Sequence, residues 1–179
     1  MGDGIANNDS VTTANISGVT SLIINFKNIA NLTGIEDFTA LTLLNCNDNQ
    51  LTSLDVTQNT ALVELSCGNN LQLTSLDVTQ NTALVELTCY DNQLTSLDVT
   101  QNTALTRLFC FHLQLTSLDV TQNTALVEFF CYDNQLTSLD LRNGNNTNFT
   151  IFDATANSNL NCISVDDATW ATANWTNID

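Results

Sequence analysis

The chain has 179 residues, of which 43% are hydrophobic and 12% are charged, and its formal net charge at pH 7 is −16. This length and hydrophobic content suit one domain with a substantial core and exclude a disordered chain. The negative charge repels phosphate backbones, and no apolar run is long enough to span a bilayer, so we expect neither nucleic-acid binding nor membrane insertion.

Residues 1–18 precede the first repeat-like segment, and we expect them to form an N-terminal cap over one end of the core. The opening MGDGIANNDS contains no visible signal peptide. It reads like an initiating Met placed before a mature or trimmed N-terminus. This suggests a domain whose export signal has been removed.

A repeat of about 21 residues, marked by five cysteines, fills residues 19–142. The cysteines follow one another at steps of 21, 22, 21 and 21 residues: Cys46, Cys67, Cys89, Cys110 and Cys131. The step of 22 contains one extra residue, Leu71. Each unit reads LxxLxCxxNxLxxLDVTxNTA, so it holds two copies of the shorter pattern LxxLx-apolar-xxN.

The shorter pattern predicts a strand followed by a turn. Alternation in L-x-C and L-x-V has the period of a β-strand, and the Asn can bond the turn backbone that follows. No single coil can bury its own apolar face, so coils must stack about 4.8 Å apart to form a continuous core. The sequence therefore predicts a β-rich solenoid, a right-handed superhelix with two short parallel strands per coil and little helix.

The motif LxxLxCxxNxL resembles the leucine-rich repeat, with Cys at a position that Leu usually holds. The nested variant with LDVTxN resembles a 21-residue class found in exported bacterial proteins. LIINFKNIANLTGIEDFTAL resembles an internalin-like entry repeat, and NSNLNCISVDDATWATANWTNID resembles the C-terminal cap of secreted Bacteroidetes-type proteins. The resemblance implies a secreted or cell-surface domain, but this fold hosts many different partners.

The ladder cysteines are expected to be reduced thiols of the core. Metal-ligand pairs usually lie two to four residues apart, which this spacing does not match. Side chains that point in parallel from neighbouring coils suit a disulfide poorly, whereas Cys serves well as a small hydrophobe. Cys162 lies outside the ladder, and it is either buried alone or separated from a disulfide partner beyond Asp179.

The second half-repeat presents a nearly constant outward row of Ser, Asp and Thr, and three interpretations stay open. The first is recent tandem duplication without a ligand. The second is Ca²⁺ binding by the Asp row, although no D-x-D-x-D-G or GGxGxD pattern is present. The third is ice binding through the Thr row, although the Asp column spoils a flat face. The Asp row consists of Asp55, Asp77, Asp98, Asp119 and Asp140.

The first half-repeat differs, because its outward residues vary and become aromatic. We expect a ligand-binding face made of Tyr90, Arg107, Phe109, Phe111, Phe130 and Tyr132. A large exposed aromatic patch needs a partner, and aromatic and Arg side chains dominate binding energy. The partner is a protein or glycan on a cell surface. Alternatively, the cap or a second copy in a homodimer covers the rings.

Two polar residues lie beside this face. Arg107 is expected to pair with Glu86 or Glu128 on neighbouring coils, as a weak surface ion pair. His112 is the only histidine of the chain. We expect it to be exposed, without a nearby acid and without a catalytic role.

Residues 143–179 are expected to form a C-terminal cap. VDDATWATANW predicts one short helix with Asp166 or Asp167 as its N-cap, and Ile163, Trp170 and Trp175 are expected to plug the last coil.

The chain carries no nucleophile elbow, phosphate loop, dinucleotide fingerprint or metal triad, so we expect no enzyme and no cofactor. The sequence favours an extracellular binding or adhesion domain. The alternative is a structural repeat spacer within a larger surface adhesin.

Overall fold

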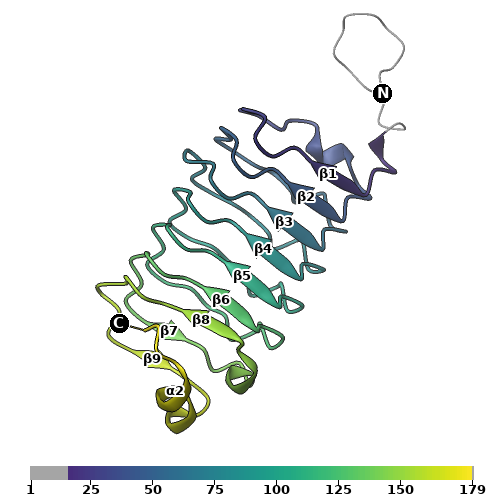
Figure 1. The fold of residues 1–179 in the computed structure, drawn as a ribbon. Helices are drawn as coiled ribbons and strands as arrows, with labels where there is room; N and C mark the ends of the chain where they lie inside the picture. Colours follow the sequence, from purple (N-terminus) through teal and green to yellow (C-terminus); the bar gives the residue numbers. More distant parts are fainter. Residues whose placement is uncertain (1–15, 179) are drawn as a thin grey trace, which may run out of the picture.

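A computed structural model describes residues 16–178 as a stack of coils. Most of the expected N-terminal cap, residues 1–15, lies outside the described residues. Each coil carries one strand of a long sheet, and the strands follow one another from the N-terminal to the C-terminal end of the stack (Figure 1). None of the helices in residues 16–178 combines the length and the hydropathy that a bilayer-spanning segment needs.

The main sheet has seven parallel strands in the order β1-β2-β3-β4-β5-β6-β8. The strands are β1 (Ser21–Ile23), β2 (Leu43–Asn45), β3 (Glu64–Ser66), β4 (Glu86–Thr88), β5 (Arg107–Phe109), β6 (Glu128–Phe130) and β8 (Ile151–Asp153). Their register places equivalent repeat positions side by side, for example Leu65 beside Leu87. The predicted β-solenoid with parallel strands and little helix is confirmed.

The core is a column of side chains that repeats from coil to coil. The Leu and Cys residues at the inward positions of strands β2 to β5 have no exposed surface, as the pattern predicts. In β6 the Leu is replaced by Phe129, which is also fully buried. Its ring packs on Phe152 of β8, with ring centroids 5.7 Å apart. At the inward position of the last two strands of the sheet, aromatic rings therefore replace Leu.

The second half-repeat is less regular than the two-strands-per-coil expectation. Only β7 (Leu139–Asp140) and β9 (Ile163–Ser164) form a second, two-stranded sheet, and elsewhere isolated bridges such as Asp55 to Asp77 link the coils. Asp55 Oδ1 accepts hydrogen bonds from Thr57 N at 3.0 Å and Thr57 Oγ1 at 2.7 Å, which closes a side-chain turn after the bridge residue. The same turn follows β8 in the main sheet, where Asp153 Oδ1 accepts from N and Oγ1 of Thr155.

Buried asparagines hold the turns together, in two columns with different hydrogen bonding. Asn70, after a Cys strand, donates from Nδ2 to the carbonyls of Cys46, Cys67 and Gly68, and its Oδ1 accepts from Leu51 N at 3.0 Å. Asn81 of the second column also donates to two carbonyls. Its Oδ1 accepts no hydrogen bond from the described residues, and the same holds for Asn59, Asn102 and Asn123.

The five ladder cysteines are buried free thiols, as the repeat position predicts. Burial raises the pKa of Cys46 to about 12, and it raises the pKa of the other four ladder thiols as well. Cys162 is also free but exposed, so the alternative that it is buried alone is wrong. It precedes β9 at the end of the stack, where no further described coil covers it.

Alkylation of the native, reduced protein at pH 8 should modify one thiol, Cys162, and leave the five ladder thiols untouched. The thiolate is the reactive species, and a buried thiol with a raised pKa is neither ionised nor accessible. Intact-mass measurement after brief maleimide treatment counts the adducts. The same reaction in denaturant is the control and should add six. A second adduct under native conditions would contradict the buried ladder.

The C-terminal segment forms the predicted helix, α2 (Ala168–Asn174), and two short 3-10 turns occur elsewhere, η1 (Ile35–Asp37) and η2 (Asn146–Asn148). Asp167 caps α2 by accepting a hydrogen bond from Trp170 N at 2.9 Å, which confirms the N-cap prediction. Trp175 packs on Phe152 with centroids 4.7 Å apart, and Asn177 O accepts from Ala154 N. These contacts cover β8, the last strand of the sheet.

Candidate binding face

The outward side chains of the main sheet form four columns that cross the coils. The register aligns Glu86, Arg107 and Glu128 in a first column, and Thr88, Phe109 and Phe130 in a second. A third column follows the buried cysteines and contains Tyr90, Phe111 and Tyr132. A fourth, one residue further along, contains Asp91, His112 and Asp133. We call the five aromatic side chains of the middle columns the aromatic face.

The five rings of the aromatic face form one connected cluster, as the sequence predicts. Tyr90 and Phe111 are stacked, with ring centroids 4.7 Å apart and an angle of 1° between the ring planes. Phe111 and Tyr132 are also stacked, with centroids 4.5 Å apart and an angle of 9°. Phe109 lies 5.3 Å from Phe130, which contacts Tyr132 at 6.4 Å. The rings of the third column therefore lie face to face along the stack of coils.

Stacking leaves these rings half-buried rather than fully exposed. Both faces of Phe111 are covered by its neighbours, so the edges of the stacked rings face outward. Gly68 makes room for the first ring, since a Cβ atom there would lie 2.9 Å from the ring of Tyr90. A side chain at position 68 would displace Tyr90 and disturb the stack.

Arg107 lies beside the aromatic face and pairs with Glu86, one of its two predicted partners. Its Nε donates to Glu86 Oε2 at 2.8 Å, and its Nη2 contacts the same oxygen. The hydrogen bonds that Arg107 donates to Glu86, and then the charge of Glu86, raise the pKa of Arg107. Arg107 and Glu86 belong to β5 and β4, so the pair links adjacent coils on one border of the face.

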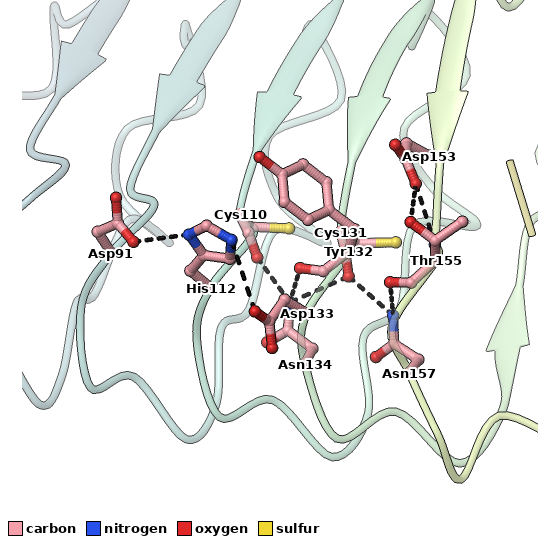
Figure 2. Close-up of polar contacts among 10 residues, drawn as sticks. All are labelled: Asp91, Cys110, His112, Cys131, Tyr132, Asp133, Asn134, Asp153, Thr155 and Asn157. Atoms are coloured by element: carbon pink, nitrogen blue, oxygen red, sulfur yellow. Dashed lines mark hydrogen bonds and ion pairs between the residues drawn. The ribbon is translucent and has the colours of Figure 1, made fainter. Parts of the chain in front are cut away.

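His112 occupies the other border and has acidic neighbours that the sequence analysis did not expect. Its Nδ1 lies 2.8 Å from Asp91 Oδ1, and its Nε2 lies 3.5 Å from Asp133 Oδ2 (Figure 2). The imidazole is also edge-on to Phe111 and Tyr132, at 5.2 and 5.1 Å. Its exposure is confirmed, with 42% of the side chain accessible, but the expectation of no nearby acid is wrong.

The geometry behind this arrangement is a backbone turn that recurs in every Cys coil. Asp91, His112 and Asp133 all have positive φ, near 50°, which turns their side chains to the same side. Each is separated from the next by the 21-residue repeat step. Applying that step to His112 would have found both acids in the sequence.

Carboxylates around the face give it a negative potential, which contributes to the raised pKa values of its two tyrosines. Burial raises the pKa of Tyr90, and the charges of Asp48 and Asp91 raise it further. Burial likewise raises the pKa of Tyr132, followed by the charges of Asp153, Asp91 and Asp133. The phenol groups thus lie within the field of acids on neighbouring coils.

The Ser-Asp-Thr row lies on the second half-repeats. As at Asp55, Oδ1 of Asp77, Asp98 and Asp119 accepts hydrogen bonds from N and Oγ1 of the Thr two residues later. Asp140 instead pairs with Arg142, at 2.9 Å from Nε, and this contact lowers the pKa of Asp140 to about 2. Residues 16–178 contain no group of three or more His, Cys, Asp or Glu side chains arranged to hold a metal ion.

Within residues 16–178, two cavities are each lined by two acids, and one of them, of about 430 Å³, contains Asp55 and Asp77 of the Ser-Asp-Thr row. Near the N-terminal end, Glu36 and Asp55 line a cavity of about 190 Å³. Glu36 accepts a hydrogen bond from Gly34 N at 2.9 Å, and Asp55 bonds Thr57. Both carboxylates therefore serve local turns. The hydroxyl groups that line this cavity are those of Thr33 and Ser53, and Thr33 Oγ1 donates to Asn31 Oδ1 at 2.6 Å.

No protein-family model matches the chain, and no curated protein matches it either. Several solved structures do match the chain. The functional domain of InlJ from Listeria monocytogenes, described as including a cysteine ladder, matches with a TM-score of 0.70 and 31% identity over 87% of this chain and 41% of that one. The internalin InlF of the same species matches with a TM-score of 0.71 and 24% identity, over 87% of this chain and 49% of that chain.

A third match, internalin C2 from Listeria monocytogenes, has a TM-score of 0.70 and 22% identity over 95% of this chain and 83% of that chain. The chain thus spans less than half of the InlJ and InlF structures. Parallel strands, a buried cysteine ladder and these neighbours agree on one architecture. This protein has an internalin-like leucine-rich-repeat fold.

Proposed function

We propose that this chain is a non-catalytic extracellular binding domain that recognises a protein through its aromatic face. The supporting observation is the connected cluster of five half-buried rings on the outer face of the sheet in a strongly acidic chain. Aromatic side chains give large contact area at low cost in conformational entropy, and they form the energetic centres of interfaces. Secretion or display on a cell surface is part of this proposal, in keeping with the internalin-like neighbours.

A protein fits the ring geometry better than a glycan. Sugars pack on the faces of aromatic rings, but in the third column both faces of Phe111 are occupied by Tyr90 and Tyr132. Ring edges and the two phenol groups remain for contact. A flexible protein segment can follow such edges with its aliphatic side chains while it hydrogen-bonds the hydroxyl groups.

Replacing Phe109, Phe130 and Tyr132 together by Ser should abolish ligand binding without unfolding the domain. The three rings lie on the outer surface of the sheet, so their loss removes contact area but leaves the inward Leu and Cys column intact. A screen against glycan arrays and surface-protein extracts, with each captured protein identified and its binding remeasured in pure form, provides the measurement. Circular dichroism confirms the fold.

The matched control carries three exposed substitutions away from the sheet, Gln80, Gln101 and Gln122 to Ser. A ligand that binds wild type and control but not the aromatic variant supports the proposal. Equal binding by all three proteins would refute the aromatic face as the binding site, whereas no ligand for any of them would favour a structural spacer within a larger adhesin.

A further inference from the structure

Building on the proposed binding function, we infer that the ligand of the aromatic face is a basic protein segment. Its Lys or Arg side chains would lie along the ring edges and pair with carboxylates on both borders of the face. Three observations carry this inference: the placement of the acids, their incomplete neutralisation within the chain, and the lack of a comparable apolar surface beside the other acidic row.

Acids border the aromatic face on both sides. Six carboxylates lie in the first and fourth outward columns: Asp48, Glu64, Glu86, Asp91, Glu128 and Asp133. The same two columns contain one guanidinium, Arg107, and one imidazole, His112. The rings therefore lie in a strip between two rows of negative charge. A ligand that covers the strip meets both rows.

Intramolecular pairs use only part of this charge. Arg107 pairs with Glu86, and His112 lies between Asp91 and Asp133. In the described residues, Glu64 and Glu128 form no ion pair, and the side chain of Asp133 is 64% exposed. Covering the rings with a neutral or acidic partner would desolvate these carboxylates without compensation, which costs free energy.

A basic segment supplies that compensation and also matches the rings. The aliphatic stems of Lys and Arg pack on apolar edges while their charged ends reach carboxylates a few ångströms away. Tyr90 and Tyr132 carry hydroxyl oxygens that can accept hydrogen bonds from these cations. A second copy of this chain would bring the same acidic borders together, so charge repulsion disfavours a homodimer through the face.

The Ser-Asp-Thr row is also acidic but does not offer the same site. Asp55, Asp77, Asp98 and Asp119 stand in a similar row, each held by its own Thr. No aromatic side chain accompanies them. Without apolar anchors, such a row attracts cations only through a screened surface potential. It therefore serves as an internal control for non-specific binding of basic peptides.

The two tyrosines of the chain are Tyr90 and Tyr132, so tyrosine ring signals report on the aromatic face alone. Protein labelled with ¹³C in its tyrosine rings is titrated with pentalysine and pentaarginine, and separately with pentaglutamate and cellopentaose. We expect both tyrosine signals to shift with the basic peptides and not with the other two probes. Dissociation constants follow from the same titrations at low and physiological salt.

Matched variants separate the face from the net charge. Replacing Glu64 and Glu128 by Gln and Asp133 by Asn should weaken pentaarginine binding about tenfold, since three exposed rim carboxylates that can pair with the peptide are lost. Asp55, Asp77 and Asp98 replaced together by Asn remove the same charge and should change the dissociation constant less than about twofold.

Three results would overturn the inference: no tyrosine shift with basic peptides, shifts with cellopentaose instead, or equal weakening by the two sets of variants. Each is distinguishable from failure of the proposed function. If a neutral or acidic protein binds wild type but not the Phe109/Phe130/Tyr132 serine variant, the aromatic face still binds a ligand and only its basic character is refuted.

Discussion

Raising the pH from 7 to 10 should lower the free energy of unfolding by several kcal/mol, because the ladder thiols stay protonated only in the folded state. Burial raises the pKa of Cys46 from 9.0 to about 12, and it raises the pKa of the other four in the same direction. The unfolded chain releases these protons near pH 9, so stability is complete below this pH and falls above it. Each thiol contributes on the order of 1 kcal/mol at pH 10, one pH unit above the pKa in the unfolded chain.

Urea denaturation in the presence of a reductant, at steps between pH 7 and pH 10, measures this loss. Typical domains are stable by about 5 to 15 kcal/mol, so the midpoint should fall steeply. The control is Cys89 replaced by Ala, which lowers stability at every pH but removes one titrating thiol and so flattens the pH dependence. A free energy of unfolding that stays constant between pH 8 and pH 10 would mean that the thiols are already ionised or oxidised in the folded protein.

Replacing Asn70 by Ala should cost about 3 kcal/mol of stability, whereas replacing Asn81 by Ala should cost about 1 kcal/mol, although both residues are fully buried. The described residues offer Leu51 N no acceptor other than Asn70 Oδ1, so the first substitution leaves a buried N–H unpaired. The second leaves no such group. Val56 O still accepts from Asn59 N at 2.9 Å, and Asn59 O from Leu62 N at 3.1 Å.

Urea midpoints of the two variants at pH 7 test this difference. Similar m-values are required for the comparison, since they show that both variants unfold from an equally compact state. Equal costs for the two substitutions would contradict the assignment, because they would imply that the Oδ1 of Asn81 accepts a hydrogen bond as strong as that of Asn70.

The sequence predicted most of the solenoid because its inward positions hardly vary. Leu, Cys and Asn recur at one spacing, and that spacing determines which side chains meet in the core. The last coil was missed because Phe149, Phe152 and Ala154 replace Leu, Leu and Cys before Asn157, and the step from Cys131 to Ala154 is 23 residues. The same apolar pattern is present there with other side chains, so β8 pairs with β6 as the repeat requires.

The candidate site was predicted less completely. The aromatic cluster followed from column positions, but the choice of Glu86 over Glu128 as the partner of Arg107 depends on side-chain rotamers that spacing does not specify. The two acids beside His112 lie on turns with positive φ rather than on strands, and the sequence shows them only when the 21-residue step is applied to the turn position as well. Sequence periodicity thus predicts neighbours well, and it predicts ring stacking and charge pairing only where the backbone direction is also known.

The coil that contains Arg107 and His112 also bears on how the protein reaches its native order. Residues 51–62, 73–84, 94–105 and 115–126 are identical, so a folding chain could stack a coil on the wrong neighbour and skip one in between. Native order places Arg107 and His112 beside acids of the two adjacent coils, whereas a skipped coil brings Glu86 onto Glu128 and Asp91 onto Asp133. These charges therefore penalise a misthreaded solenoid as well as border the aromatic face.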